Sequence, residues 1–186
     1  MKKNEFVPTE ERPFNEQTLA KFRRFKEVNL SDTPLAHPHQ LFENLPRVEK
    51  LRIMRAPLQV CPYNIEKMAL LTHLEICFTR IETLPPTLGN LVNLVLLNVS
   101  CNPDLVALPD SIGKLENLAT LNVASCPSLG ALPHTLSDCA KLESIVCNDT
   151  DPAIVSSSVL TLPTLTSVYN GYENIIDILR RQNNNS

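Results

Sequence analysis

Apolar residues recur along this chain with a period of 23 or 24 residues. The first apolar residue of each period, which we call position 1, is Phe25, Val48, Leu71, Leu94, Leu118, Leu142 or Leu165. Apolar residues also fill positions 4 and 6, except for Asn170 at position 6 of the last repeat, and another apolar residue follows five to seven residues after position 6 in the first six repeats. Because alternate side chains of a strand point to the same face, positions 4 and 6 predict a short strand with one buried face. The fixed period predicts a solenoid in which each repeat stacks on the next.

The second half of each repeat has a different pattern, which begins with leucine and proline. Leu84-Pro85 and Leu108-Pro109 are examples, and glycine follows at Gly89 and Gly113. Proline fits the first turn of a helix, where its missing N–H has no partner to lose. These segments therefore predict a turn or two of 3₁₀ or α-helix on the side opposite the strands. Glycine at these two positions can accept a positive φ after that turn.

Position 9 of the repeat is expected to lie where the chain leaves the strand. A small side chain there can bond the neighbouring turns. The residues at this position are Thr33, Ala56, Thr79, Asn102, Cys126 and Thr150.

These residues resemble the leucine-rich repeat superfamily. The 23-residue unit with its LPxxIGxLxNL segment is similar to the intracellular Ras-suppressor-type class and to the repeat domains of bacterial effectors. The longer repeats, with Ser100-Cys101-Asn102 and Ser125-Cys126-Pro127, resemble those of plant-pathogen effectors. The resemblance covers about residues 22–170. It implies an α/β leucine-rich repeat solenoid with a curved parallel sheet on the concave side and short α or 3₁₀ segments on the convex side. It implies a scaffold and names no ligand.

The domain boundaries follow from the ends of the repeats. Residues 1–24 are expected to form a tail, irregular over 1–14, and a capping helix over 15–24. Residues 25–172 form the solenoid, and 173–186 form a second capping helix, over 173–182, and a tail. Caps cover the core and the strand edge at each end of a solenoid. The alternative for the last helix is a partner-binding element.

Composition excludes several classes of function. The net charge is −3, and residues 61–170 carry four Lys or Arg against ten Asp or Glu, so we expect no nucleic-acid partner. No apolar run approaches 18 residues, so no membrane span is expected. The six cysteines include no CxxC pair, and we expect neither a metal site nor a cofactor. The start shows no secretory signal, which predicts reduced thiols in a cytoplasm, either the organism's own or that of a host.

The concave face is the candidate binding site, because positions 3, 5, 7 and 8 are expected to point away from the core. A basic row, Lys50, Arg52 and Arg55, lies beside Glu75 and near apolar residues, which matches the composition of binding hot spots. The alternative for Phe78 is packing over a turn within its own repeat. The candidate partner-binding residues are Lys50, Arg52, Met54, Arg55, His73, Glu75, Phe78, Leu96, Asn98, Asn122, Val146 and Tyr169.

Catalytic interpretations are disfavoured. His73 and Cys77 are four residues apart on one strand, about 13 Å, which is too far for a hydrogen bond. Cys147-Asn148-Asp149 resembles the Cys-x-Asp motif of a bacterial effector ubiquitin-ligase family, but it lies on a repeat strand with Cys147 in a core column. The sequence therefore predicts a non-enzymatic module that binds a protein, including the case of an effector in a host cell. The alternative is a substrate-recruiting adaptor for a ubiquitin ligase or another catalytic machine.

Overall fold

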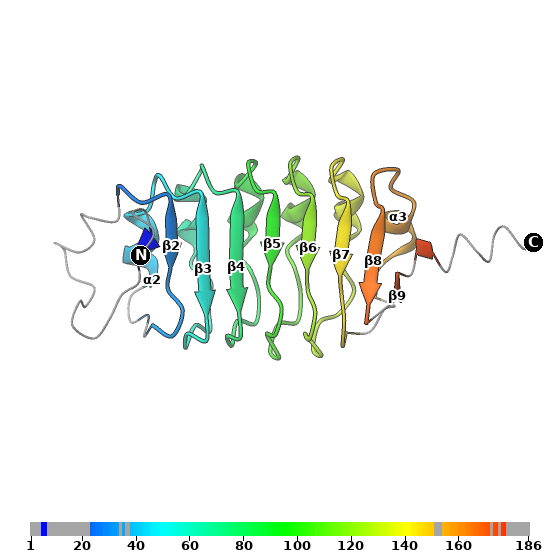
Figure 1. The fold of residues 1–186 in the computed structure, drawn as a ribbon, viewed down its shortest axis with the longest axis horizontal. Helices are drawn as coiled ribbons and strands as arrows, with labels where there is room; N and C mark the ends of the chain where they lie inside the picture. The colour runs from blue at the N-terminus through cyan, green and yellow to red at the C-terminus, as the bar shows by residue number, and fades with distance from the viewer. Residues whose placement is uncertain are drawn as a thin grey trace, which may run out of the picture.

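A computed structural model of the chain describes residues 5–6, 23–33, 35, 38–150, 154–171, 173–174 and 176–177. Within these residues the strands form one sheet in chain order (Figure 1). The strands are β1 (Glu5–Phe6), β2 (Glu27–Asn29), β3 (Lys50–Met54), β4 (His73–Cys77), β5 (Leu96–Asn98), β6 (Thr120–Asn122), β7 (Ser144–Val146), β8 (Ser167–Asn170) and β9 (Glu173–Asn174). Neighbours from β1 to β8 are parallel, and β9 is antiparallel to β8.

The strands pair in a register of one repeat. Leu51 pairs with Leu74, and Leu74 pairs with Leu97, so position 4 of each strand lies beside position 4 of the next. Side chains from the same repeat position therefore form rows across the sheet. The predicted leucine-rich repeat solenoid with a parallel sheet is confirmed.

Short helices lie behind the sheet in the view of Figure 1. The 3₁₀ helices are η1 (Tyr63–Lys67), η2 (Pro86–Asn90), η3 (Asp110–Lys114) and η4 (His134–Asp138), and α2 (Pro38–Glu43) and α3 (Ser157–Leu160) are α-helical. The predicted 3₁₀ or short α segments are confirmed. The proline after leucine is the N-cap with an extended backbone, as at Pro85 and Pro109, and not a residue of the first turn as expected.

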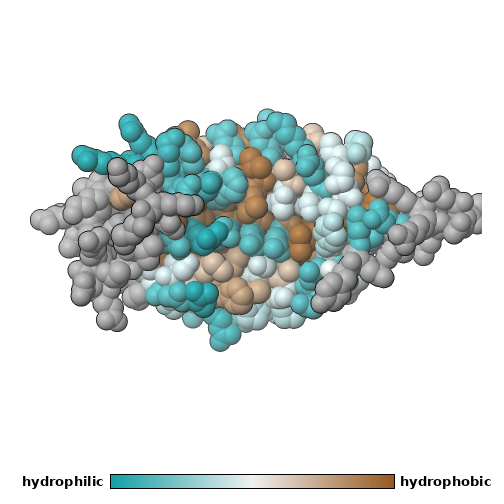
Figure 2. All heavy atoms as spheres, viewed as in Figure 1, coloured by the Kyte–Doolittle hydropathy of each residue, from teal (hydrophilic) through white to brown (hydrophobic). Residues whose placement is uncertain are grey.

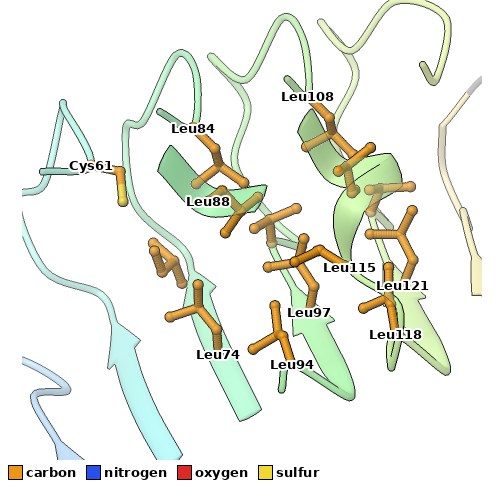
Figure 3. Packing of buried hydrophobic residues seen from close by; sticks show 14 of the residues in the cluster. Cys61, Leu74, Leu84, Leu88, Leu94, Leu97, Leu108, Leu115, Leu118 and Leu121 are labelled. Atoms are coloured by element: carbon orange, nitrogen blue, oxygen red, sulfur yellow. The ribbon is translucent and has the colours of Figure 1, made fainter. Parts of the chain in front are cut away.

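The core fills the layer between the sheet and these helices. Figure 3 shows leucines from β4, β5 and β6 pointing into this layer, where they meet leucines from the helical side. Leu74, Leu97 and Leu121 have no exposed surface, and neither do Leu88 and Leu115. Burying a leucine side chain stabilises the fold by about 1.5–3 kcal/mol. Every repeat shares this layer with its neighbours, so the core is continuous.

Position 9 makes the expected bonds between turns. The Oδ1 atom of Asn102 accepts from the backbone N–H of Thr79 at 2.9 Å and from its hydroxyl at 2.7 Å. The Nδ2 atom of Asn102 donates to the carbonyl oxygens of Ile76, at 2.7 Å, and Val99, at 2.8 Å. Asn102 thus joins the repeats that contain β4 and β5 from inside the core.

Gly89 and Gly113 do not use the positive φ that glycine permits. Among the described residues, Gly171 is the glycine with a positive φ, at 79°. A Cβ atom at Gly113 would lie 2.5 Å from the carbonyl oxygen of Thr135, and one at Gly89 would lie 2.7 Å from the Cβ atom of Ser111. Glycine is therefore required by the close approach of successive 3₁₀ helices, not by a left-handed turn.

The ends differ from the expected helical caps. Residues 1–14 contain β1, which extends the sheet beyond β2, so that segment is not irregular throughout. The predicted last helix begins instead with β9, and only Ile176 and Asp177 are helical among its described residues. Of the predicted first helix, residues 15–22 lie outside the described residues, and Arg23 and Arg24 form a turn. Across the described part of the chain, no helix has the length and apolar character needed to span a membrane.

Candidate protein-binding face

The exposed face of the sheet is built mainly from positions 3 and 5 of the strands. The strand ends before position 8, where the backbone adopts a positive φ in six successive repeats: Asp32, Arg55, Phe78, Cys101, Ser125 and Asp149. Position 7 is buried at Cys77, which is 1% exposed, and at Ser100, which is 9% exposed. Position 7 therefore does not point away from the core at Cys77 and Ser100, whereas position 8 is exposed at Asp32, Arg55, Phe78 and Asp149.

Charged side chains cover β2 to β4. Arg52 donates to the Oε1 atom of Glu75 from Nη2 at 2.7 Å and from Nε at 3.1 Å. The ammonium of Lys50 lies 3.0 Å from Glu27. The predicted basic row is therefore not a free positive patch, because each of its cations is paired with a carboxylate of an adjacent repeat. We call this region the ionic half of the face.

Arg55 makes the most specific of these pairs, at the end of β3. Its Nε atom donates to Oδ1 of Asp32 and its Nη2 atom to Oδ2, both at 2.7 Å. These hydrogen bonds, with the charge of the guanidinium, hold the pKa of Asp32 below its ordinary value and raise the pKa of Arg55. Both side chains are exposed to solvent, so the pair contributes orientation more than stability.

The ionic half contains a shallow hollow. Its volume is ≈ 290 Å³, and it is lined by Glu27, Val28, Asn29, Lys50, Leu51, Arg52 and Glu75. A ligand that entered this hollow would meet carboxylates and cations that already satisfy one another.

Uncharged side chains cover β5 to β8, a region we call the neutral half. It comprises Leu96, Asn98, Thr120, Asn122, Ser144, Val146, Ser167 and Tyr169, of which Tyr169 is exposed and the others are half-buried. Figure 2 shows this face, with hydrophilic residues over the first strands and hydrophobic residues gathered over the middle of the sheet. The predicted residues Leu96, Asn98, Asn122, Val146 and Tyr169 are thus brought together.

The two asparagines also have a structural role that sequence reasoning missed. The Oδ1 atom of Asn98 accepts from the backbone N–H of Ser100 at 3.1 Å, and that of Asn122 accepts from Ala124 at 3.0 Å. Each side chain thereby bonds the end of its own strand, just before the left-handed turn. The signal was the asparagine three residues before the left-handed residue of the turn, a position where its side chain readily bonds the backbone.

Two aromatic side chains stand out at the edges of the face. Phe78, at the end of β4, is 52% exposed, and Tyr169 on β8 is 41% exposed. Phe78 does not pack into the core, because about half of its surface is exposed. The remaining predicted residues, Met54 and His73, are half-buried on β3 and β4 in the ionic half, and His73 Nδ1 lies 2.9 Å from the hydroxyl of Thr72.

The surroundings of the buried cysteines do not favour nucleophile chemistry. Burial raises the pKa of the Cys77 thiol and of the Cys147 thiol, which opposes formation of the reactive thiolate. The pKa of Cys61 is raised to about 12 by complete burial. The described residues include no group of three or more His, Cys, Asp or Glu arranged to hold a metal ion.

Comparisons with known proteins bear on the fold. No family model matches the sequence, and a search of curated proteins finds no match. A leucine-rich repeat protein of Leptospira interrogans is similar in structure, with a TM-score of 0.77 and 25% identity over 83% of this chain and 39% of its own. Internalin C2 of Listeria monocytogenes has a TM-score of 0.67 and 18% identity over 84% of this chain and 66% of its own.

A third similar structure is the Toll–Spatzle complex of Drosophila, with a TM-score of 0.66 and 18% identity. The match covers 84% of this chain and 21% of that chain. This chain thus spans about two-fifths of the Leptospira protein and one-fifth of the Drosophila chain. The repeat columns, the parallel register and these neighbours agree: the chain has the leucine-rich repeat fold.

Proposed function

We propose that this chain is a non-enzymatic module that binds a protein partner on the exposed face of its sheet. The observation that carries the proposal is the pair of exposed aromatic side chains, Phe78 and Tyr169, that the core does not use. Phe78, at the end of β4, lies next to the neutral half and Tyr169 belongs to it, and the apolar members Leu96 and Val146 of that half are only half-buried. Aromatic and apolar groups inside a polar rim are the composition of protein-binding hot spots.

The shape of the face supports a large partner over a small molecule. Strands β2 to β8 lie at about 4.8 Å spacing, which makes a face roughly 30 Å across. Small-molecule sites are concave pockets that surround the ligand. Among similar structures, Toll was solved in complex with Spatzle, a precedent for a protein ligand on a related solenoid.

Affinity capture with matched variants tests this proposal. Phe78→Asp/Tyr169→Asp places two charges on the face, and we expect it to lose the partner that the wild-type chain captures. The control is Tyr63→Asp, which makes an aromatic-to-aspartate change at a residue on η1 that is 63% exposed and lies behind the sheet. Because all three positions are exposed, each change should alter the free energy of unfolding by less than about 1 kcal/mol. Capture of the same partner by the double variant would show that the face is not the binding site.

The resemblance of the longer repeats to those of effectors supports a second part of the proposal, that the chain acts in the cytoplasm of a host cell. Running the capture in bacterial and eukaryotic lysates in parallel tests it, since an effector's partner is found only in the host lysate. A partner found only in the bacterial lysate would contradict the effector proposal. Capture of ubiquitin-ligase subunits would favour the alternative, in which the chain is a substrate-recruiting adaptor.

A further inference from the structure

We propose that Asn98 and Asn122 form a paired hydrogen-bond donor that binds an uncharged main-chain carbonyl oxygen of an extended segment of the partner. This inference rests on the proposed function and names the chemistry that its neutral half recognises. We call the two side-chain amides the donor pair.

The orientation of both amides is set by the backbone. In each side chain Oδ1 accepts a backbone N–H from the residue two positions later, Ser100 for Asn98 and Ala124 for Asn122. An N–H group can be bonded only by the oxygen end of an amide, so Nδ2 must point the other way. Among the described residues neither Nδ2 atom donates a hydrogen bond, and neither is a buried atom without a partner. Both are therefore donors open to a ligand.

The spacing of the pair suits one carbonyl oxygen. Asn98 and Asn122 are register partners on β5 and β6 and make the same bond to their own strands, so their Nδ2 atoms are separated by about one strand spacing, ~4.8 Å. A carbonyl oxygen accepts along two lone-pair directions, and donors at ~2.9 Å along these are about 5 Å apart. The two amides can thus hold a single oxygen between them.

The surroundings admit a main chain. The residues that follow the donor pair are small, Ser100 at position 7 of one repeat and Ala124 at position 7 of the next. Thr120, at the start of β6 on the same face, is also of modest size. Leu96 precedes Asn98 on β5 and Val146 is the register partner of Asn122, so these two half-buried side chains flank the amides and offer apolar contacts to the side chains of the bound segment.

Charge favours a neutral carbonyl over a carboxylate. Glu75 is the register partner of Asn98 on the other side, and Asp149 is exposed at the end of β7. The nearest cation of the row, Arg52, is already bonded to Glu75. A carboxylate seated between the amides would be repelled by these acidic groups. No cation of the basic row is free to offset that repulsion, because Lys50 and Arg55 are also paired. An uncharged acceptor meets no such repulsion.

The chain offers a matched control for the donor pair. Asn29 occupies the same repeat position on β2, and its Oδ1 atom likewise accepts the backbone N–H of the residue two positions later, Ser31, at 3.0 Å. Its register partner is Arg52, so it lies in the ionic half. Replacement of Asn29 by aspartate repeats the chemical change outside the donor pair.

The test uses a display library of random linear peptides as the probe. Wild-type chain and Asn29→Asp are expected to select the same peptides, and Asn98→Asp/Asn122→Asp to bind them roughly ten- to a hundredfold more weakly. Aspartate keeps the bond to the backbone N–H but replaces each outward donor by an acceptor. Thermal melting checks folding, and the single variant Asn122→Asp serves if the double variant is unstable.

A thioamide scan of the best peptide separates a main-chain acceptor from a side-chain one. Sulfur accepts hydrogen bonds less well than oxygen, so one thioamide position should weaken binding to the wild-type chain severalfold and leave binding to Asn98→Asp/Asn122→Asp unchanged. The inference would be overturned if every thioamide position gave the same affinity, or if the peptides bound through their acidic side chains.

The two proposals fail in different ways. If the double asparagine variant bound the selected peptides as the wild-type chain does, the donor pair would be wrong while the face remained a binding site. If the wild-type chain selected no peptide, the donor pair would likewise be overturned. The proposed function would then be decided by the capture experiment with Phe78→Asp/Tyr169→Asp, which does not depend on the asparagines.

Discussion

At the scale of single residues, this protein assigns its small polar side chains to the backbone first. Asn98 and Asn122 bond the ends of their strands, and Asn102 bonds the turns of two repeats inside the core. The backbone turns sharply after each strand, so its N–H and C=O groups need partners that the strands do not supply. Sequence reasoning identified the position of Asn102 but not the bonds that the other two asparagines make.

We expect Asn102→Ala to lower the free energy of unfolding by about 3 kcal/mol or more. The substitution removes a fully buried amide and leaves the backbone N–H of Thr79 and the carbonyl oxygens of Ile76 and Val99 without that partner. Denaturant unfolding followed by circular dichroism measures the change. The control is Asn117→Ala, which removes two exposed hydrogen bonds, one to the carbonyl oxygen of Val92 and one from Lys141, and should change stability by less than about 1 kcal/mol. Equal effects of the two substitutions would contradict the proposed role of Asn102.

We also expect the pKa of Asp32 to be below the ordinary value of about 3.9, because Arg55 bonds its carboxylate. A lowered pKa in the folded state means that any stabilisation is present above the ordinary value and is lost as the pH falls through the lowered one. Side-chain carboxyl NMR across an acid titration measures it. In Arg55→Gln the pKa of Asp32 should return toward the ordinary value, and an unchanged pKa would show that the ion pair is not its cause.

At the scale of elements, successive 3₁₀ helices stack so closely that they limit the size of the side chains between them. Gly113 on η3 faces the backbone of Thr135 on η4, and Gly89 on η2 faces Ser111 on η3. The motif that predicted these helices placed glycine correctly but suggested a different reason for it. A positive φ is a local property, whereas this close approach belongs to two elements 22 residues apart in the chain.

Gly113→Ala should therefore destabilise the fold by about 2 kcal/mol, since its Cβ atom would lie 2.5 Å from a backbone oxygen that cannot move without shifting η4. Gly130→Ala is the matched control. Its Cβ atom would lie 3.6 Å from the nearest atom, an ordinary contact, and its φ is not positive. We expect it to be neutral or slightly stabilising, because alanine reduces the entropy of the unfolded chain. Thermal unfolding of both variants measures the change in stability. Similar losses of stability would contradict the close approach of the 3₁₀ helices as the reason for glycine at position 113.

At the scale of the whole molecule, one continuous core couples the repeats. Five of the cysteines are buried and are spread over four repeats, while Cys101 is half-exposed. A reagent that modifies thiols should therefore label Cys101 first, and the buried cysteines only when the solenoid opens.

Leu97→Ala, in the middle of the sheet, should lower the free energy of unfolding by about 2–5 kcal/mol, since Leu97 is fully buried. If the repeats open together, the labelling rates of Cys61 and Cys139 should rise by the same factor, although they lie on opposite sides of β5 in the chain. Labelling at pH 8 followed by mass spectrometry measures both rates. Acceleration of only one of the two would show that part of the solenoid opens independently.

The repeat pattern predicted most of the fold because its information is periodic and local. Val28, Leu51 and Leu74 are buried as expected, since position 4 faces inward in every repeat. The caps were predicted less well, because β1 and β9 are only two residues long and gain their bonds from β2 and β8. A segment that short has no periodicity to read.

The binding face was predicted as a set of residues but not as an arrangement. The sequence showed Lys50, Arg52 and Arg55 on neighbouring positions of one strand and suggested a basic patch. Their partners come from adjacent repeats: Glu27, Glu75 and Asp32 are each 23 residues away. Ion pairing between strands depends on the register and on side-chain conformation.

By itself, the sequence determined that this protein is a stack of repeats, because a 23- to 24-residue period with two inward-facing positions has no other way to bury its apolar residues. Only the tertiary structure decided which charges neutralise one another, why Gly113 must be glycine, and that Asn98 and Asn122 point their Nδ2 atoms outward. Each of these depends on atoms brought together across a strand spacing, and a linear sequence does not contain that distance.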